Sequence, residues 1–385
     1  MKVANFMDSS LVELDKKGNL TASPEIYNPN NAYSKVVHFT PHYQDLKYTD
    51  YFKQFSIQLY SYGVDTLWTS RVVVGFFKIF KQFSKNKFDI VRGRLPYLGS
   101  LYGLLMAKIF RIPFVLSLGG DNRLCQEKNK KFNYNSKFIS YTMEKFVLRY
   151  SDRIICPNLF TKKYVERLIG KKQSEKRCTV IPCISEAIPE REEKGFICER
   201  FNIPSDAVLI LIIGFLNRYK YTDVLYNVIK KWKSPLPDKK IVFAFCGDGP
   251  LYQKGVQEFL DNESVYFLGW QEREIVHQLI RRAYLLLIPM SGFVLLEAAS
   301  LGKPVITSKV EWHAEMIEDH VTGLLVDPLS VEEWVNQINF ALLNPQKMTT
   351  YAKCLEKKYW SKYSGLIAKQ LEIDLYRSLY QNWKK

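Results

Sequence analysis

The sequence lacks the long apolar run that a membrane-spanning helix needs. Nowhere does it hold about eighteen consecutive uncharged apolar residues, the length that favours such a helix. The first residues, MKVANFMDSSLVELD, carry acids where a signal peptide needs an apolar core. We therefore predict a cytoplasmic protein without a spanning helix.

Patterns typical of metal sites and disulfide frameworks are missing as well. The seven cysteines form no Cys-x-x-Cys pair and no cluster with histidine, and no Asp-x-Asp motif occurs. An odd number of scattered cysteines favours reduced thiols. The sequence therefore predicts no structural metal, and no cofactor apart from whatever substrate the protein binds.

Positive charge is abundant but unevenly placed. The net charge is +16; residues 1–184 hold 30 Lys or Arg against 14 Asp or Glu, whereas residues 185–385 hold 25 of each kind. This asymmetry predicts an anionic partner for the first half, which is a nucleic acid, an anionic membrane or a phosphorylated acceptor. The basic half shows no RNP, zinc-finger or helix-turn-helix signature, so we do not expect a nucleic-acid partner.

A length of 385 residues suggests two domains, and apolar runs alternate with helical patterns in both halves. Such alternation predicts an α/β fold built on parallel sheets. We expect little regular structure in residues 1–34, helices at 51–62 and 71–87, and a glutamate-rich linker at 183–204. The expected strands are 35–39, 63–68, 88–92, 113–118, 151–157, 178–182, 207–214, 240–246, 265–268, 284–289 and 304–308.

The stretch LLLIPMSGFVLLEAASLGKPVITS, residues 285–308, reads as one βαβ unit with short joints. A sharp turn at Gly292 would leave the N–H groups of Phe293, Val294 and Leu295 free to hold a phosphate at the helix N-terminus. Glu297, about one turn further on, could accept hydrogen bonds from two sugar hydroxyls. An ordinary strand–turn–helix joint with a solvated glutamate is the alternative.

Three more segments place polar or aromatic residues directly after strands. GFLNRYK carries Arg218 and Lys220, two cations that could clamp a diphosphate. GDGP forms a tight turn at Gly247, and FLGW ends in Trp270, which could cover a flat base. Solvated loop charges, a plain turn and a core aromatic are the respective alternatives.

Taken in order, these segments resemble the nucleotide-sugar site of retaining glycosyltransferases of the GT-B fold, most closely glycosyltransferase family 4. The resemblance implies two Rossmann-like domains facing a cleft, with an acceptor domain at 1–184, a donor domain at 185–355 and a helix in 356–385 returning to the first domain. It also implies metal-independent transfer, with retention, from a nucleoside diphosphate sugar, most simply a UDP-sugar. The implied acceptor is lipid-linked or an oligosaccharide, as in surface polysaccharide or glycolipid assembly.

The chain departs from the family pattern at three places. Phe215 stands where the family has an arginine, Pro289 replaces the first of two glutamates, and Gly119 takes the place of a histidine. Asp121 is then the nearest polar candidate on the acceptor side, with capping of the next helix as the alternative. These departures leave open a rival interpretation, in which the chain is a non-catalytic subunit that binds nucleotide sugars.

The segment RVVVGFFKIFKQFSKNK, residues 71–87, has the pattern of an amphipathic helix. On a helical wheel Val72, Phe76, Phe80 and Phe83 fall within about 80° of one another, and the opposite side carries four cations, which are Arg71, Lys78, Lys81 and Lys85. A core-facing helix with a solvated basic face would show this pattern. An interfacial helix would show it too, and we therefore predict peripheral binding to an anionic membrane surface on its cytoplasmic face.

Overall fold

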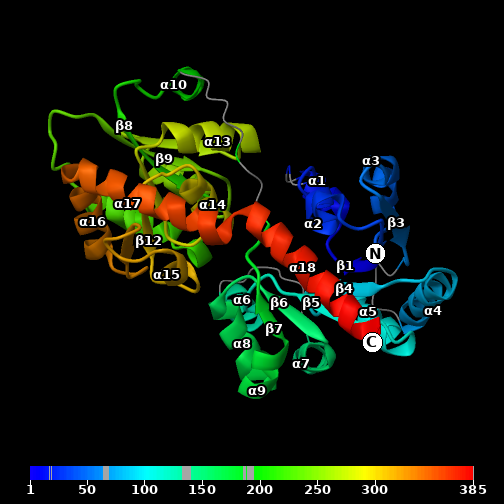
Figure 1. The fold of residues 1–385 in the computed structure, drawn as a ribbon. Helices are drawn as coiled ribbons and strands as arrows, with labels where there is room; N and C mark the ends of the chain where they lie inside the picture. The colour runs from blue at the N-terminus through cyan, green and yellow to red at the C-terminus, as the bar shows by residue number, and fades with distance from the viewer. Residues whose placement is uncertain are drawn as a thin grey trace. The chain divides into compact units, whose positions relative to one another are not determined.

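The computed structural model describes residues 1–16, 18, 20–63, 69–131, 140–184, 188 and 195–384. Contacts along the chain divide it into two compact units (Figure 1). The first unit comprises residues 1–127, 135–184 and 365–385, and the second comprises residues 128–134 and 185–364. Each unit is built on one parallel sheet, so the predicted α/β class with two domains is confirmed.

The first unit has a seven-stranded sheet in the order β3-β2-β1-β4-β5-β6-β7. Its strands are β1 (Lys2–Met7), β2 (Lys35–Thr40), β3 (Ile57–Ser61), β4 (Ile90–Arg94), β5 (Phe114–Ser117), β6 (Arg153–Cys156) and β7 (Cys178–Val180). The strand order reverses between β1 and β4. In open parallel sheets such a switch point marks a crevice at the carboxyl ends of the strands, where ligands bind.

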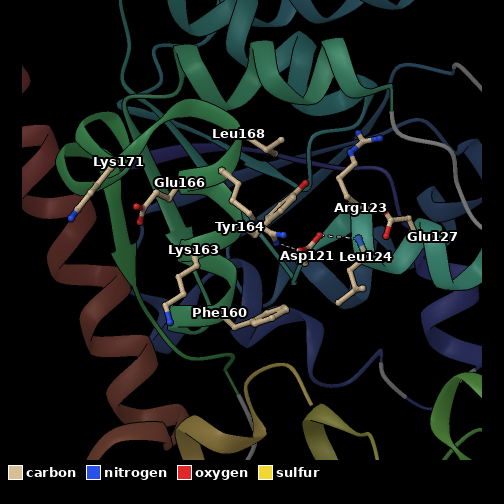
Figure 2. Close-up of a pocket in the computed structure, with 11 residues that line it drawn as sticks. Asp121, Arg123, Leu124, Glu127, Phe160, Lys163, Tyr164, Glu166, Leu168 and Lys171 are labelled. Atoms are coloured by element: carbon tan, nitrogen blue, oxygen red, sulfur yellow. Dashed lines mark hydrogen bonds and ion pairs between the residues drawn. The ribbon is translucent and has the colours of Figure 1, made fainter. Parts of the chain in front are cut away.

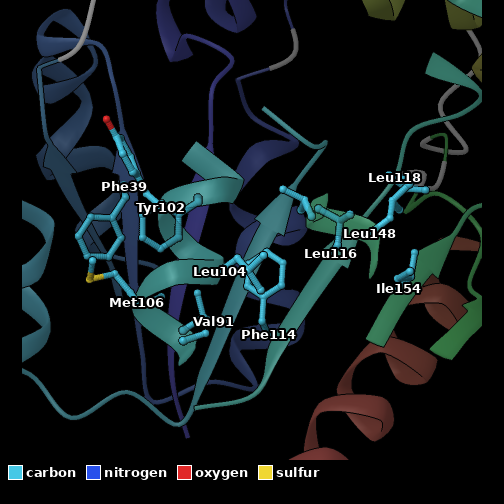
Figure 3. Close-up of a cluster of buried hydrophobic side chains, with 14 of the residues drawn as sticks. Phe39, Val91, Tyr102, Leu104, Met106, Phe114, Leu116, Leu118, Leu148 and Ile154 are labelled. Carbon is cyan, nitrogen blue, oxygen red and sulfur yellow. The ribbon is translucent and has the colours of Figure 1, made fainter. Parts of the chain in front are cut away.

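Helices cover both faces of this sheet. They are α1 (Leu11–Lys16), α2 (Ser23–Tyr27), η1 (Pro29–Asn31), η2 (Tyr43–Tyr48), α3 (Thr49–Lys53), α4 (Thr69–Lys85), α5 (Leu98–Ile109), α6 (Asn122–Lys131), α7 (Tyr141–Tyr150), α8 (Leu159–Ile169), α9 (Lys171–Arg177) and α18 (Gly365–Lys384). On one face Val91, Phe114 and Leu116 pack against α5 (Figure 3). Neighbouring residues of the same strands, such as Ile90 and Val115, point to the other face.

The second unit has a six-stranded parallel sheet in the order β10-β9-β8-β11-β12-β13. Its strands are β8 (Val208–Ile213), β9 (Ile241–Cys246), β10 (Val265–Gly269), β11 (Leu285–Ile288), β12 (Val305–Ser308) and β13 (Leu324–Val326). The helices are α10 (Phe196–Phe201), η3 (Arg218–Lys220), α11 (Thr222–Lys231), α12 (Tyr252–Glu258), α13 (Arg273–Arg282), α14 (Gly292–Ser300), α15 (His313–Met316), α16 (Val331–Leu343), α17 (Pro345–Lys358) and the π-helical turn η4 (Tyr359–Tyr363). The switch point of this sheet lies between β8 and β11.

The last helix, α18, belongs to the first unit (Figure 1). Glu372 forms a buried ion pair with Arg92 of β4, with Nη1 and Oε1 2.9 Å apart. Tyr376 stacks on Tyr33 at 5.6 Å between ring centroids, and both rings are fully buried. The chain changes from the second unit to the first between residues 364 and 365, later than the expected boundary at residue 356.

Two expectations for the N-terminal segment are wrong. Residues 1–34 are not irregular, because they supply the central strand β1 and the short helices α1, α2 and η1. The helix expected at residues 51–62 is instead α3 followed by strand β3. The strand expected at residues 63–68 lies almost wholly outside the described residues, and Gly63 is not in a strand.

The described part of the chain contains no helix with the length and apolar character needed to cross a membrane.

Candidate donor site in the second unit

Glycine turns follow three adjacent strands of the second unit, β8, β9 and β10. The backbone N–H of Gly214 donates to the carbonyl of Cys246 at 3.0 Å, and the N–H of Gly247 donates to the carbonyl of Gly269 at 2.8 Å. These bonds pin the ends of the three strands to one another. The three segments that the sequence marks as GFLNRYK, GDGP and FLGW therefore meet at one edge of the sheet.

Gly247 is required by this close approach. Its φ of 143° lies in the region that side chains avoid, and a Cβ atom there would stand 2.0 Å from the carbonyl oxygen of Gly214. Gly249 is constrained in the same way, because its Cβ would meet the carbonyl oxygen of Leu216 at 2.5 Å. Because both positions are glycines, the main chain of the GDGP turn can lie directly against the main chain that follows β8.

Lys220 is held in place by the turn that follows β8. Asn217 accepts a hydrogen bond from the Lys220 N–H at 2.9 Å and so begins the short helix η3. The Lys220 ammonium folds back over Gly214, since Nζ lies 3.6 Å from where a Cβ of that glycine would stand. Burial lowers the pKa of Lys220, and the carboxylate of Glu311 opposes that shift. The partly desolvated cation is therefore positioned to attract an anion at the carboxyl end of β8.

The other candidates after β8 and β10 are exposed. The Arg218 side chain is 63% exposed, and its Nε lies 3.8 Å from Asp223, a weak surface pair. Trp270 is 56% exposed rather than part of the core, so its ring remains available to a flat ligand. Phe215, in the place of the family's arginine, is exposed too.

The turn between β11 and α14 presents an uncovered helix N-terminus. Helix α14 begins at Gly292, and Ser291 at its N-cap makes no side-chain capping bond. Gly292 and Phe293 are exposed, while Val294 and Leu295 pack into the core. Among the described residues no side chain caps the first N–H groups of the helix, and the predicted phosphate contact there stays a prediction.

His313 of α15 supports this turn, and the sequence gave no sign of it. Its Nε2 lies 3.1 Å from the Ser291 carbonyl oxygen, and its Nδ1 lies 2.7 Å from Thr307 Oγ1. Burial lowers the pKa of His313 to about 4, so the ring is neutral at physiological pH. A lone histidine in KVEWHAEM matches no local motif, and only the fold brings it beside residue 291.

Glu297 projects from α14 towards α13. Its Oε1 lies 3.7 Å from Nη2 of Arg273 and 3.7 Å from Nε2 of His277, and its side chain is 12% exposed. Both separations are too long for hydrogen bonds, although the opposite charge of Arg273 attracts the carboxylate. The carboxylate can therefore still accept hydrogen bonds from a ligand. The predicted role of Glu297 towards sugar hydroxyls stays a prediction.

Asp121 belongs to the first unit. Its Oδ1 accepts from the N–H of Leu124 at 2.9 Å and caps α6, and its Oδ2 pairs with Arg167 at 2.6 Å. It lines a hollow of about 950 Å³ between α6 and α8 (Figure 2). The capping alternative describes this contact, and a role for Asp121 towards an acceptor stays a prediction.

The structure thus gathers the second-unit candidates along neighbouring strands, whereas Asp121 belongs to the first unit. Lys220 and Gly247 follow β8 and β9, and the helix bearing Glu297 follows β11, across the switch point from β8. This is the position where parallel α/β sheets bind nucleotides. Among the described residues, no group of three or more His, Cys, Asp or Glu side chains could hold a metal ion.

Comparison with known proteins assigns this arrangement to a class. The fold is that of a GT-B glycosyltransferase, and the chain is a glycosyltransferase that depends on a nucleotide sugar. Residues 193–358 match the family described as glycosyl transferases group 1, and residues 34–184 match glycosyltransferase family 4. The chain belongs to the GT-B glycosyltransferases of the family 4 type, as the sequence resemblance indicated.

Individual relatives are distant but cover most of the chain. The lipopolysaccharide 1,2-N-acetylglucosaminetransferase of Salmonella typhimurium is 24% identical over 76% of this chain and 79% of its own length. A 41.2 kDa protein in the cps region of Klebsiella pneumoniae is 26% identical over 66% of this chain and 69% of its own. The structure of HepE from Anabaena in complex with UDP and glucose superposes with a TM-score of 0.75 at 16% identity, covering 98% of this chain and all (100%) of that one.

Proposed function

We propose that the second unit binds a UDP-sugar and that the protein transfers the sugar, with retention and without a metal ion, to an acceptor hydroxyl held by the first unit. The observation that carries the proposal is the convergence of Lys220, the Gly247 turn and the open N-terminus of α14 around the β8/β11 switch point. UDP as the nucleotide is supported by the complexes of HepE with UDP, glucose and UDP-glucose.

In the proposed reaction the main task of the protein is to stabilise negative charge. The bond between the anomeric carbon and the diphosphate oxygen breaks, a bond to the acceptor oxygen forms, and the acceptor proton leaves with the diphosphate or to solvent. Negative charge develops on the departing diphosphate, where the Lys220 ammonium and the first N–H groups of α14 would stabilise it. The carboxylate of Glu297 would accept hydrogen bonds from the two ribose hydroxyls.

Replacing Glu297 with alanine should weaken UDP binding by about tenfold or more, because charge-assisted hydrogen bonds contribute roughly 1.5–3 kcal/mol. Isothermal titration of UDP into the wild type and the variant measures this effect. The control is Glu274→Ala, which removes a carboxylate from the first turn of α13. Equal UDP affinity in wild type and a folded Glu297→Ala protein would remove Glu297 from the site.

We further propose that the acceptor is lipid-linked or otherwise membrane-borne, and that α4 contacts an anionic membrane. Most of the apolar stripe predicted for a membrane interface faces the core instead, because Phe83 is buried and Val72 and Phe76 pack against the core. Phe80 is 38% exposed. Val73, Val74 and Phe77 are more exposed still, with Phe77 at 63%. An apolar strip left outside the core is typical of an interaction surface.

Charge beside this strip favours an anionic lipid surface over another apolar partner. Lys81 and Lys85 are exposed on the same helix, and Lys78 donates to the exposed Tyr43 hydroxyl at 2.7 Å. Each basic residue near an anionic bilayer contributes about 1 kcal/mol, and apolar side chains add interfacial burial. The relatives, a lipopolysaccharide 1,2-N-acetylglucosaminetransferase and a protein in a cps region, are consistent with an acceptor at a membrane.

Changing Lys78, Lys81 and Lys85 together to glutamate should abolish sedimentation with vesicles that contain anionic phosphatidylglycerol. Wild-type binding should need the anionic lipid and weaken as salt rises, because salt screens these charges. The matched control changes Lys347, Lys353 and Lys357 of α17 to glutamate and should leave binding intact. Wild-type protein that stays in the supernatant at low salt would contradict the membrane proposal and leave a soluble acceptor.

A further inference from the structure

Arg94 ends β4 at the switch point of the first unit's sheet. Strand β1 pairs with β4 there, with Met7 opposite Arg94 in the register. The carboxyl ends of these two strands form the place where an open parallel sheet offers a crevice for ligands. The donor candidates occupy the corresponding place in the second unit, and nothing described so far occupies this one.

Arg94 is partly buried, and it differs from the buried charges of the first unit because it has no partner among the described residues. Arg92 pairs with Glu372, Asp121 with Arg167, and Glu144 with Arg123. Among the described residues, Arg94 makes no hydrogen bond and no ion pair. Burial, with the like charge of Arg92, lowers the pKa of Arg94. An anion would give this partly buried guanidinium the partner that it lacks among the described residues.

The residue after Arg94 has an unusual backbone conformation, and the turn after the neighbouring strand has open space. Leu95 adopts a φ of 61°, a conformation costly for a branched side chain and often found at functional sites. On the adjacent strand, β5 leads into a turn at Gly119 and Gly120; a Cβ at Gly120 would meet no atom within 4 Å. The turn that follows β5, the strand next to β4, therefore has open space at Gly120.

We propose that Arg94 binds an anionic group of the acceptor, a phosphate or a carboxylate, at the carboxyl end of β4. This inference rests on the proposed function, which assigns the donor diphosphate to the second unit and leaves an anion in the first unit to the acceptor. A guanidinium matches the two oxygens of either group with parallel hydrogen bonds, as an ammonium does not. Arg94 would thus help to select acceptors that carry such a group.

The test titrates inorganic phosphate, and separately acetate, into the full-length protein saturated with UDP, so that the proposed diphosphate site is filled. Phosphate or acetate should bind the wild type and raise its melting temperature, and the ion that does so better identifies the group. Arg94→Gln should bind that ion about tenfold or more weakly, and Arg94→Lys should retain part of the binding. Neither variant should melt below the wild type in the absence of the ion, because in the described part of the chain the guanidinium has no partner to lose.

Lys163→Gln is the matched control, since Lys163 lines the separate hollow between α6 and α8 (Figure 2). It should bind the ion like the wild type. Loss of binding in Lys163→Gln, equal binding in wild type and Arg94→Gln, or no binding of either ion by the wild type would overturn the inference. Failure of UDP to bind while the Arg94-dependent anion effect persists would instead count against the proposed donor site.

Discussion

Replacing Lys220 with alanine should lower kcat by about 10²- to 10³-fold, the range found when one donor to a developing negative charge is removed. The reason is that the diphosphate gains charge as it leaves, so a cation beside it stabilises the transition state more than the bound donor. Burial already disfavours the Lys220 ammonium in the free protein, as its lowered pKa indicates. Its removal should therefore not lower the melting temperature.

Steady-state kinetics of UDP release, together with a melting curve, measure both parts of this prediction. Lys231→Ala at the exposed end of α11 is the control and should behave like the wild type. Arg218→Ala should have a smaller effect than Lys220→Ala, because the Arg218 side chain is largely solvated. A Lys220→Ala enzyme with normal kcat and a lower melting temperature would show that Lys220 is structural.

Replacing Glu372 with glutamine should destabilise the first unit by about 3–5 kcal/mol, the cost of leaving a buried charge without its partner. Arg92 and Glu372 are both almost fully buried, and the pair joins α18 to β4. Arg92 also donates to the Ile26 carbonyl at 2.8 Å, so its guanidinium cannot turn towards water without losing that bond too. For a unit of this size the melting temperature should fall by about 6–20 °C.

Differential scanning calorimetry of Glu372→Gln checks this result. Lys369→Gln is the control on the same helix, because its pair with Glu25 is more exposed and should matter far less. The double change Arg92→Met with Glu372→Leu removes both charges and should recover most of the lost stability. A Glu372→Gln protein as stable as the wild type would mean that the pair does not hold α18 in place.

The second unit was largely predictable from sequence because its signals are local. The expected βαβ unit is β11, α14 and β12, and Gly247 follows its strand as expected. Strand β1 was missed because Asn5 interrupts its apolar run; in the fold Asn5 hydrogen-bonds to His38 of β2 at 2.8 Å. Strand β3 was missed because its spacing with the preceding residues also fits a helix.

Contacts between residues far apart in the chain could not be predicted from the sequence, for a different reason. His313 reaches residue 291, and Glu372 reaches Arg92 across most of the chain. Each residue alone is an ordinary polar residue in a helical segment, and only the packing of the sheet and its helices gives it a partner. The same holds for Arg94, which has no hydrogen-bond or ion-pair partner among the residues that the structure describes.

Release of UDP from a panel of UDP-sugars, compared with GDP- and CDP-sugars, tests the central claim most directly. The wild-type protein, supplied with a membrane extract as the source of acceptor, should release UDP from at least one UDP-sugar and move its sugar into the extract. Lys220→Ala should lose most of this release. Binding of UDP-sugars without release or transfer from any of them would contradict catalysis and favour a nucleotide-sugar-binding subunit.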